Sequence, residues 1–414
     1  MEREVLVHLQ RDGLDVLVGR LWTRVRGGRE TCSFEYAPEW LADRNNFALE
    51  PELPLAPGTA HSERPLFNAF ADTAPDRWGQ MLVRRHERAL ARREGRPPRT
   101  LHERDFLLQV DDETRLGALR FALAGQDGFV ASTGRRVPPL LELPRLLSAA
   151  TRIAEDRETD DDLQLVLAPG TSLGGARPKA SVLDQDGHLL VAKFPRKDDE
   201  WPVTRWEMTA LTLAKAAGID VPVARLDVIA KRPVLMLRRF DRAAGHRVPF
   251  ISALTALAAS DHGTHSYLEL VEAIRRESAD VNADLRELWR RMVFNILISN
   301  TDDHLRNHGW LRTAEGWRLA PAFDLNPMPV DVKPRIHALA IDESDATGSL
   351  ELALSVAPLF GIDKPAAARA VAREVGKAVA RWRPIAAKHD LTRTQLDRMA
   401  SAFEHDDLAA AIAR

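Results

Sequence analysis

The sequence predicts an α+β fold in two lobes, with a β-rich subdomain at the N-terminus and a mostly helical lobe at the C-terminus. Three observations predict it. Asp-Gly turn signals separate alternating apolar stretches within residues 5–21 and 180–194. Beyond residue 250 the apolar residues recur at helical spacing. With 414 residues and 45% hydrophobic content, the chain is long enough for two or three domains.

Composition excludes several classes of protein. The net charge is -2, from 58 basic and 60 acidic residues, so the total charge makes no strong case for direct binding to nucleic acid or membranes. Cys32 is the single cysteine, which excludes a disulfide framework and a cysteine metal cage. The N-terminus lacks an apolar signal core, and no apolar run approaches the roughly 20 residues of a membrane span. We therefore expect a cytoplasmic protein.

The N-terminal part combines strands with one long helix. Residues 5–21 predict a hairpin that turns at Asp12-Gly13. Residues 66–95 predict a helix, and Leu116–Leu123 a further short strand pair. Scattered glycine and proline over 127–145 indicate a subdomain boundary.

The middle part predicts a second hairpin at 180–194, with its turn at Asp186-Gly187. A glycine-bearing loop precedes the hairpin, a helix over 205–217 follows it, and a strand over Leu226–Leu237 comes next. Strand, glycine loop, strand, helix and strand is the order of a kinase N-lobe. We therefore expect a two-lobed protein-kinase-like fold.

The C-terminal part is predicted to be helical. Ser266 and Glu269 form a capping box, and the apolar residues between Leu285 and Ile296 recur at helical spacing. Short strands on either side of Glu315-Gly316 predict a small hairpin, and Pro384 predicts a helix break. We expect three domains, at residues 1–125, 126–245 and 246–414.

The stretch from Asn300 to Asn307, followed by Asp324, carries the residue types that phosphoryl transfer needs. Asp302 is the candidate catalytic base, which would orient an attacking hydroxyl and take its proton. Asn307 and Asp324 offer the oxygen ligands that Mg²⁺ prefers, and Asp324 is expected at the end of a short apolar strand. The interval from Asp302 to Asn307 is that of the kinase catalytic loop. Asp303 competes for the base role, and simple turn or capping roles remain open.

Residues of the middle part could hold phosphate groups. Lys193 stands in the second strand of the hairpin, where a kinase lysine reaches the phosphates, and Glu207 is its candidate ion-pair partner. Gly174, Gly175 and Ala176 lie in the glycine-bearing loop, to which Lys179 adds positive charge. A solvated lysine and an ordinary glycine turn are the alternatives.

His304 has two interpretations. It could be a metal ligand beside Asp302 and Asp303 in a metal-dependent hydrolase. We favour a histidine whose hydrogen bonds brace the catalytic loop.

The chain resembles the HipA family, the serine/threonine kinases of bacterial toxin–antitoxin pairs. The resemblance extends over nearly the whole chain. The matching stretches are Thr301 to Asn307 with Phe323-Asp324, Ser172 to Lys179, Arg239 to Arg242, Val18 to Leu21, Phe34 with Tyr36, and Trp40-Leu41.

The resemblance implies a role for each matching residue. Asp302 would be the base, and Asn307 and Asp324 would hold magnesium. Ser172 would be an autophosphorylated loop serine, whose phosphate repels the phosphates of ATP. The nucleotide would contact the backbone of Arg238, Arg239 and Phe240 through adenine, and otherwise Gly174, Gly175, Ala176, Lys179, Lys193, Glu207 and His304.

The sequence departs from the family pattern at three places. Arg238 stands where the family commonly has an acidic residue, and Pro178 removes one backbone donor from the phosphate loop. The segment from Leu66 to Pro75 also departs from the family's leucine- and proline-rich pattern, and we expect this departure to affect the choice of partner or substrate.

The sequence and the resemblance together predict an ATP- and Mg²⁺-dependent serine/threonine protein kinase. The family's target class implies an aminoacyl-tRNA synthetase as substrate. The implied partner is a helix-turn-helix antitoxin of HipB type, through which DNA would be bound indirectly. The alternatives are a catalytically weak corepressor, a small-molecule phosphotransferase and a metal-dependent hydrolase.

Overall fold

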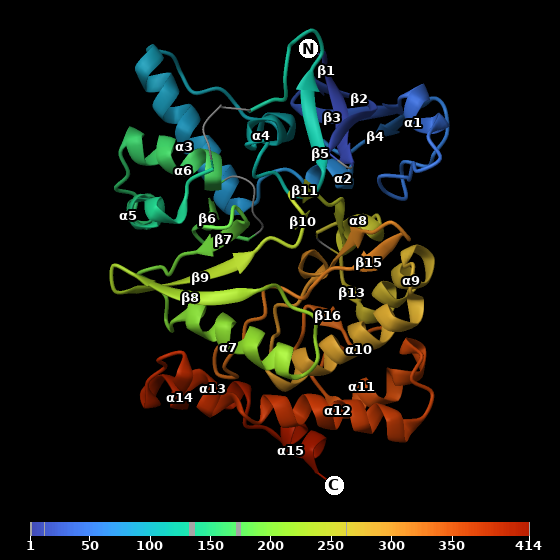
Figure 1. The fold of residues 1–414 in the computed structure, drawn as a ribbon, viewed down its shortest axis with the longest axis vertical. Coiled ribbons are helices and arrows are strands. Elements are labelled where there is room, and N and C mark those ends of the chain that lie inside the picture. Colours follow the sequence, from blue (N-terminus) through green and yellow to red (C-terminus); the bar gives the residue numbers. More distant parts are fainter. Residues whose placement is uncertain (1, 12, 132–136, 171–174, 262, 414) are drawn as a thin grey trace. The chain divides into compact units, whose positions relative to one another are not determined.

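The structure is a computed structural model that describes residues 2–11, 13–131, 137–170, 175–261 and 263–413 (Figure 1). The chain forms two compact units. The first unit contains Met1–Asp198 and Val228–Ile251, and the second contains Asp199–Asp227 and Ser252–Arg414. Helices and strands occur in both units, and the C-terminal part is mostly helical.

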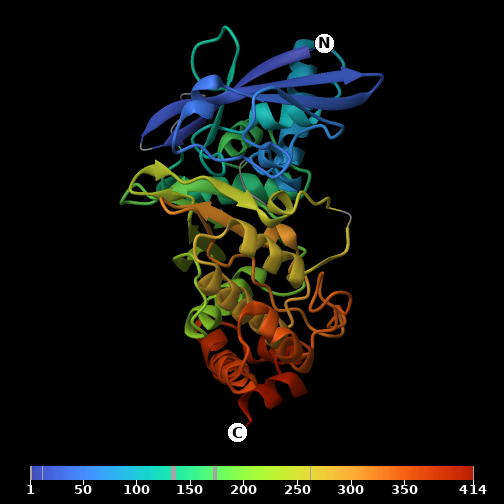
Figure 2. The same cartoon turned by 90° about the vertical axis from the view of Figure 1, so that its right-hand side faces the viewer.

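A five-stranded antiparallel sheet opens the first unit. Its order is β4-β3-β2-β1-β5, and the two long strands β1 and β2 are clear in Figure 2. One face is buried, because Val5, Val7 and Leu9 alternate inward along β1. The bounds are β1 (Glu2–Arg11), β2 (Leu14–Arg26), β3 (Arg29–Tyr36), β4 (Thr59–Ser62) and β5 (Leu119–Leu123).

This sheet confirms one sequence prediction and corrects another. Strands β1 and β2 form the predicted hairpin, although Asp12 of its turn lies outside the described residues. The strand pair predicted over Leu116–Leu123 is wrong. A single strand, β5, forms there and pairs with β1, because its buried Leu119 and Phe121, which lie opposite Leu9 and Val7, complete the core face of the sheet.

The helix predicted over 66–95 is two helices, α2 (Asn68–Ala71) and α3 (Arg77–Glu94). Pro75 cannot donate a backbone hydrogen bond, and the Asp76 side chain accepts one from Gly79 N at 2.9 Å. These two residues restart the helix. Two shorter helices complete this part, α1 (Pro38–Ala42) and α4 (Glu103–Gln109).

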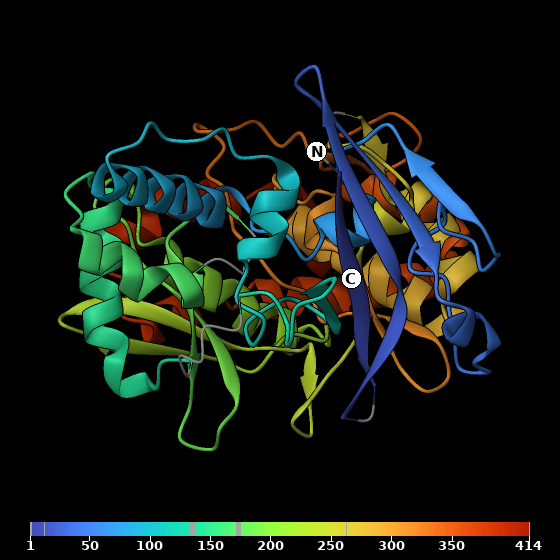
Figure 3. The ribbon, with the colours of Figure 1, turned by 90° about the horizontal axis from the view of Figure 1, so that it is seen from above.

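A second sheet of the first unit contains the strands β6 (Lys179–Leu183), β7 (Leu189–Lys193) and β9 (Arg232–Arg238). Strands β6 and β7 form the predicted hairpin, with Lys179 directly opposite Lys193. Alternate residues pack with helices into a hydrophobic core that includes Leu146, Ile153, Val166, Ala180, Val182, Leu190 and Ala192. The sequence analysis missed these helices, α5 (Leu143–Ala154) and α6 (Asp160–Gly170), beside which α3 lies in Figure 3.

The strand predicted over Leu226–Leu237 is also divided. Strand β8 (Ala224–Ile229) ends at a tight turn whose residues, Ala230 and Lys231, have φ values of 47° and 65°. Neither residue type favours positive φ, so the residues at this position carry no turn signal. The first unit ends in three short strands, β10 (Arg242–Ala243), β11 (His246–Arg247) and β12 (Phe250–Ser252), of which the last reaches the second unit.

The second unit contains α7 (Val203–Ala216), α8 (Ala253–Ala256), α9 (Tyr267–Glu277) and α10 (Val281–Leu297). The predicted capping box of Ser266 and Glu269 starts α9. The predicted hairpin consists of β14 (Gly309–Arg312) and β15 (Trp317–Leu319), and β13 (His265–Ser266) pairs with β16 (Leu339–Ala340).

C-terminal helices cover this core. Trp382 stacks on Phe403 with ring centroids 4.6 Å apart, and Trp206 of α7 packs against both rings. The helix break predicted at Pro384 is wrong. The helical structure is interrupted at residues 380–381 instead, and Pro384 lies in the first turn of α13, where proline is tolerated. The helices are α11 (Leu350–Val356), α12 (Pro365–Val379), α13 (Trp382–Lys388), α14 (Arg393–Met399) and α15 (Asp406–Ile412). Within the described part of the chain, no helix has the length and apolar character to cross a membrane.

Candidate active site

The predicted catalytic segment begins where α10 ends. Ser299 takes a φ of 53° and donates from Oγ to Ala402 O at 2.9 Å. Asn300 Nδ2 then donates to Asn295 Oδ1 at 3.1 Å, which ties the chain back to the helix it has just left. These contacts fix the path of the backbone that leads from α10 to Asp302 and Asp303.

The two neighbouring aspartates have different environments. Asp302 is exposed, whereas Asp303 is buried. One oxygen of Asp303, Oδ2, accepts hydrogen bonds from the Tyr267 hydroxyl, from Asn295 Nδ2 at 2.9 Å and from His308 Nε2 at 2.9 Å. Asp303 therefore fixes the loop, while Asp302 offers its carboxylate to solvent.

The charge state of Asp303 follows from these contacts. Burial alone would raise its pKa, but the His308 ring and the Tyr267 hydroxyl hold the pKa below its ordinary value. Burial lowers the pKa of nearby His337 to about 4, although Asp303 acts in the opposite direction. The sequence analysis missed Tyr267, Asn295, His308 and His337, because only the fold brings them to Asp303.

The bracing role predicted for His304 is wrong. Its side chain is exposed and makes no hydrogen bond within the described residues, although its backbone oxygen accepts from Asn307 N at 2.8 Å. His308 braces the loop instead. A contact of His304 with nucleotide stays a prediction.

Asn307 is held against the candidate base. It ends a short 3₁₀ turn, Leu305–Asn307, and its Nδ2 donates to Asp302 O at 3.2 Å. That bond uses the amide nitrogen, and no hydrogen bond to the Asn307 amide oxygen occurs within the described residues. The side chain can therefore present its oxygen to a hard cation.

The hairpin brings the two predicted magnesium ligands to the same end of the strand pair. Trp310 lies opposite Leu319, and Ala320 N donates to Gly309 O at 2.8 Å. Asn307 precedes this pair and Asp324 follows it. The apolar strand predicted before Asp324 is wrong: β15 ends at Leu319, and Ala322 N instead donates to Asp220 O at 2.8 Å.

Asp324 has an uncommon backbone conformation, with a φ of 60°. Aspartate tolerates this left-handed region better than most residues, but it still costs energy there. Asn326 Nδ2 donates to Asp324 O at 3.2 Å, which supports the turn. The donor set of one amide oxygen and one carboxylate fits Mg²⁺, which takes oxygen ligands.

The sequence analysis also missed Lys333. Its ammonium donates to Thr301 O at 3.1 Å, next in sequence to the candidate base. Ala338 N donates to the same carbonyl at 3.1 Å. The segment after Asp324 therefore folds back onto the predicted catalytic loop, and it brings a positive charge there.

In the first unit, Lys179 and Lys193 are cross-strand neighbours, and Gly175 and Ala176 lie in the exposed end of the glycine-bearing loop. Ser172 and Gly174 lie outside the described residues. Lys193 belongs to the first unit and Glu207 to the second, so their pairing stays a prediction.

The segment predicted to meet adenine is anchored by buried charges. Arg239 N donates to Leu189 O at 2.9 Å, so this N–H already has a partner in the sheet. The Arg239 side chain, which is 5% exposed, donates to Asp241, whose Oδ2 also accepts from Gly117 N at 2.7 Å. Any adenine contact would therefore use other backbone groups of Arg238–Phe240.

Comparison with known proteins assigns the family. The model of the HipA-like C-terminal domain matches residues 171–382, which is half of the chain, and the model of the HipA N-terminal domain matches residues 14–121. The chain belongs to the HipA family. HipA of Shewanella oneidensis, solved in a complex with HipB and operator DNA, superposes with a TM-score of 0.68 at 16% identity, over 99% of this chain and 96% of that one. This likeness confirms the predicted two-lobed α+β fold.

Two curated relatives of this HipA-family chain carry kinase names. The Sinorhizobium fredii protein "Putative kinase Y4mE" is 27% identical over 322 residues, which span 70% of this chain and 71% of that protein. The Haemophilus influenzae protein "Putative kinase" is 25% identical over 210 residues, 43% of this chain and 60% of that protein.

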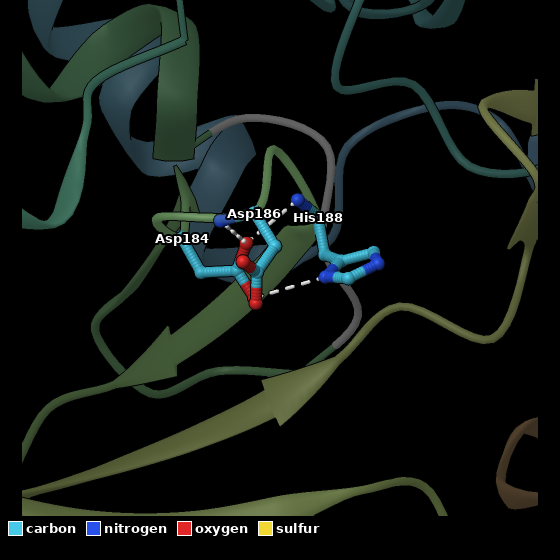
Figure 4. Close-up of side chains that lie close together, drawn as sticks. All are labelled: Asp184, Asp186 and His188. Carbon is cyan, nitrogen blue, oxygen red and sulfur yellow. Dashed lines mark hydrogen bonds and ion pairs between the residues drawn. The ribbon is translucent and has the colours of Figure 1, made fainter.

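One further cluster could offer metal ligands. Asp184, Asp186 and His188 lie together at the turn between β6 and β7 (Figure 4). The Asp184 carboxylate already accepts hydrogen bonds from Asp186 N at 3.0 Å and His188 N at 2.7 Å. These contacts are those of a well-formed turn, and in the described part of the HipA-family chain Asp302, Asp303 and His304 form no comparable group.

A pocket of about 430 Å³ lies in the first unit. Its lining includes Phe194 beside α5, and Arg232, which donates to Pro195 O at 2.6 Å. None of the predicted site residues that the structure describes lines this pocket, although Pro178 and Phe194, which adjoin Lys179 and Lys193 in the sequence, do so.

Proposed function

We propose that this HipA-family chain is an ATP- and Mg²⁺-dependent serine/threonine protein kinase. The observation that carries the proposal is the catalytic loop, which exposes Asp302, buries Asp303 in three hydrogen bonds and fastens Asn307 to Asp302 O. Family membership and the kinase names of the relatives support the same chemistry.

Each residue would contribute one part of the reaction. Asp302 would align an acceptor hydroxyl and take its proton as the phosphoryl group moves. Asn307 and Asp324 would hold the magnesium ion, which neutralises charge on the transferred phosphate. Lys193 and Lys179 would bind the phosphates, and Ser172 would be the site of autophosphorylation.

The partner and the target form the finer part of the proposal. The Shewanella HipA was solved with HipB and operator DNA, so we propose a helix-turn-helix antitoxin of HipB type as partner. DNA would then be bound indirectly. An aminoacyl-tRNA synthetase is the protein target that the family resemblance suggests.

Incubation with γ-labelled ATP and a bacterial lysate tests the proposal. The wild-type chain should label itself and a protein band, and Asp302→Asn should lower the rate about 10³-fold. Mass spectrometry should place the label of the chain on Ser172. Label found in small molecules would indicate a small-molecule phosphotransferase. Phosphate release without an acceptor would indicate a hydrolase, and nucleotide-independent binding to HipB alone a corepressor.

A further inference from the structure

A buried ion pair joins the start of α3 to the start of β6. Lys179 Nζ lies 3.1 Å from Asp76 Oδ2, and Lys179 is only 2% exposed. The other Asp76 oxygen caps α3 through Gly79 N, and Trp78 Nε1 donates to Lys179 O at 3.2 Å. Three contacts therefore fix the lysine relative to the helix.

The ammonium group also lies against the glycine-bearing loop. Gly175 has a φ of 99°, and a Cβ added there would lie 2.9 Å from Lys179 Nζ. Glycine thus suits the backbone conformation, and the absence of a side chain leaves room for the ammonium group. At the described end of the predicted phosphate loop, Gly175 therefore lies against the Lys179 ammonium group.

A second lysine makes the positive charge of Lys179 energetically less favourable. Lys193 is the direct cross-strand neighbour of Lys179, so both side chains leave the same face of the hairpin. Like charges at such positions repel each other, and a buried ammonium without a counter-charge is unfavourable. Asp76 supplies negative charge beside Lys179.

We propose that Asp76 is a positioning residue for nucleotide, which holds the Lys179 ammonium beside Gly175 so that it meets the phosphates of ATP. This inference rests on the proposed function. An ammonium group has three N–H donors, so Lys179 can keep its bond to Asp76 while it donates to a phosphate oxygen. Asp76 also offsets the repulsion between the two lysines until the phosphates arrive.

The proposal gives the N-terminal part of the chain a role in nucleotide binding. Asp76 directly follows Pro75, the end of the segment for which the sequence analysis expected an influence on partner or substrate choice. Asp76 lies outside the stretch that contains the phosphate loop and the catalytic loop. A complete phosphate site would therefore need both parts of the chain.

Calorimetric titration of the full chain with Mg-ATP and with adenosine tests this inference. Asp76→Asn keeps an N-cap for α3 but removes the charge, so we expect about tenfold to a hundredfold weaker ATP binding, the loss of one charge-assisted contact. Adenosine lacks phosphates, and its affinity should stay within about twofold of the wild-type value. Asp76→Ser, another good N-cap, should behave in the same way if the asparagine variant folds poorly.

Asp43→Asn is the matched control, because Asp43 also accepts one backbone N–H, from Asn45, and pairs with an arginine, Arg11. Its ATP affinity should equal that of the wild type. In Lys179→Met, adding Asp76→Asn should weaken ATP binding no further. Equal loss of ATP and adenosine affinity, or unchanged ATP affinity, would overturn the inference. A wild-type chain that binds no ATP would instead refute the proposed function.

Discussion

At the scale of single residues, adjacent carboxylates in one loop differ in what surrounds them. The sequence predicts Asp302 as the base with Asp303 as a competitor, because spacing alone cannot distinguish two neighbouring aspartates. Tyr267 lies 36 positions before Asp303 in the sequence, so the bond that distinguishes the two is visible only in the fold.

Replacing each aspartate by asparagine should affect stability differently. Asp303→Asn puts an amide where three donors converge, and we expect a loss of about 2–4 kcal/mol in the free energy of unfolding. Asp302→Asn changes an exposed side chain and should stay within about 0.5 kcal/mol of the wild type. Urea unfolding of both variants measures this, and equal losses would contradict the structural role of Asp303.

A buried acid in the first unit predicts a pH dependence. Burial raises the pKa of Glu50 to about 7, and its Oε2 accepts a hydrogen bond from Ala69 N at 2.5 Å. The folded state then binds more protons than the unfolded state between the ordinary glutamate pKa and about 7. Stability contributed by protonated Glu50 is present below that window and is lost as the pH rises through it.

Glu50→Gln keeps the acceptor for Ala69 N and removes the titration. We expect its free energy of unfolding to fall less between pH 5 and pH 8 than that of the wild type, by roughly 2 kcal/mol. Asp111, whose pKa burial raises to about 6, acts in the same direction and remains in the variant. Urea midpoints at both pH values provide the comparison, and parallel falls would show that Glu50 does not titrate as described.

At the scale of elements, the predictions that rest on local capping and turn signals are confirmed. The capping box at Ser266 starts α9, and the turn before His188 joins β6 and β7, as expected from the sequence. Two other predictions, a strand before Asp324 and a single strand over Leu226–Leu237, are wrong because non-local contacts and backbone strain decide the structure there. Their backbones follow partners distant in sequence, such as Asp220, or take positive φ without glycine or asparagine.

The turn at Ala230 and Lys231 is therefore a place where substitutions should increase stability. Two successive positive φ values suit Asn-Gly, so Ala230→Asn combined with Lys231→Gly should raise the free energy of unfolding by about 1 kcal/mol. Lys231→Ala keeps an L-residue in the strained conformation and should leave stability unchanged. Thermal unfolding separates the two variants, and a destabilised Asn-Gly variant would argue against this turn.

At the scale of the whole molecule, the family and fold were predictable because the motifs extend along nearly the whole chain. The division at 1–125, 126–245 and 246–414 stays a prediction. The residues predicted to bind nucleotide belong to different compact units, with Lys193 in the first and Asn307 and Asp324 in the second.

Ligand removal tests whether those residues act together. Millimolar Mg-ATP should raise the melting temperature by several degrees, since a ligand at 100 times its dissociation constant adds about 2.7 kcal/mol. EDTA should remove most of the shift, and Asn307→Ala or Asp324→Ala should resemble EDTA treatment. Asp302→Asn should keep the shift, because the base is not needed for binding. A shift independent of magnesium would contradict the assignment of the ligands.

The hydrogen bond from Ser299 to Ala402 O has a practical outcome for protein engineering. Asp407, still nearer the C-terminus, accepts from Arg335, which itself donates to Ile296 O at 3.1 Å. Trimming the last dozen residues, or fusing a rigid reporter to them, would disturb the start of the loop that contains Asp302.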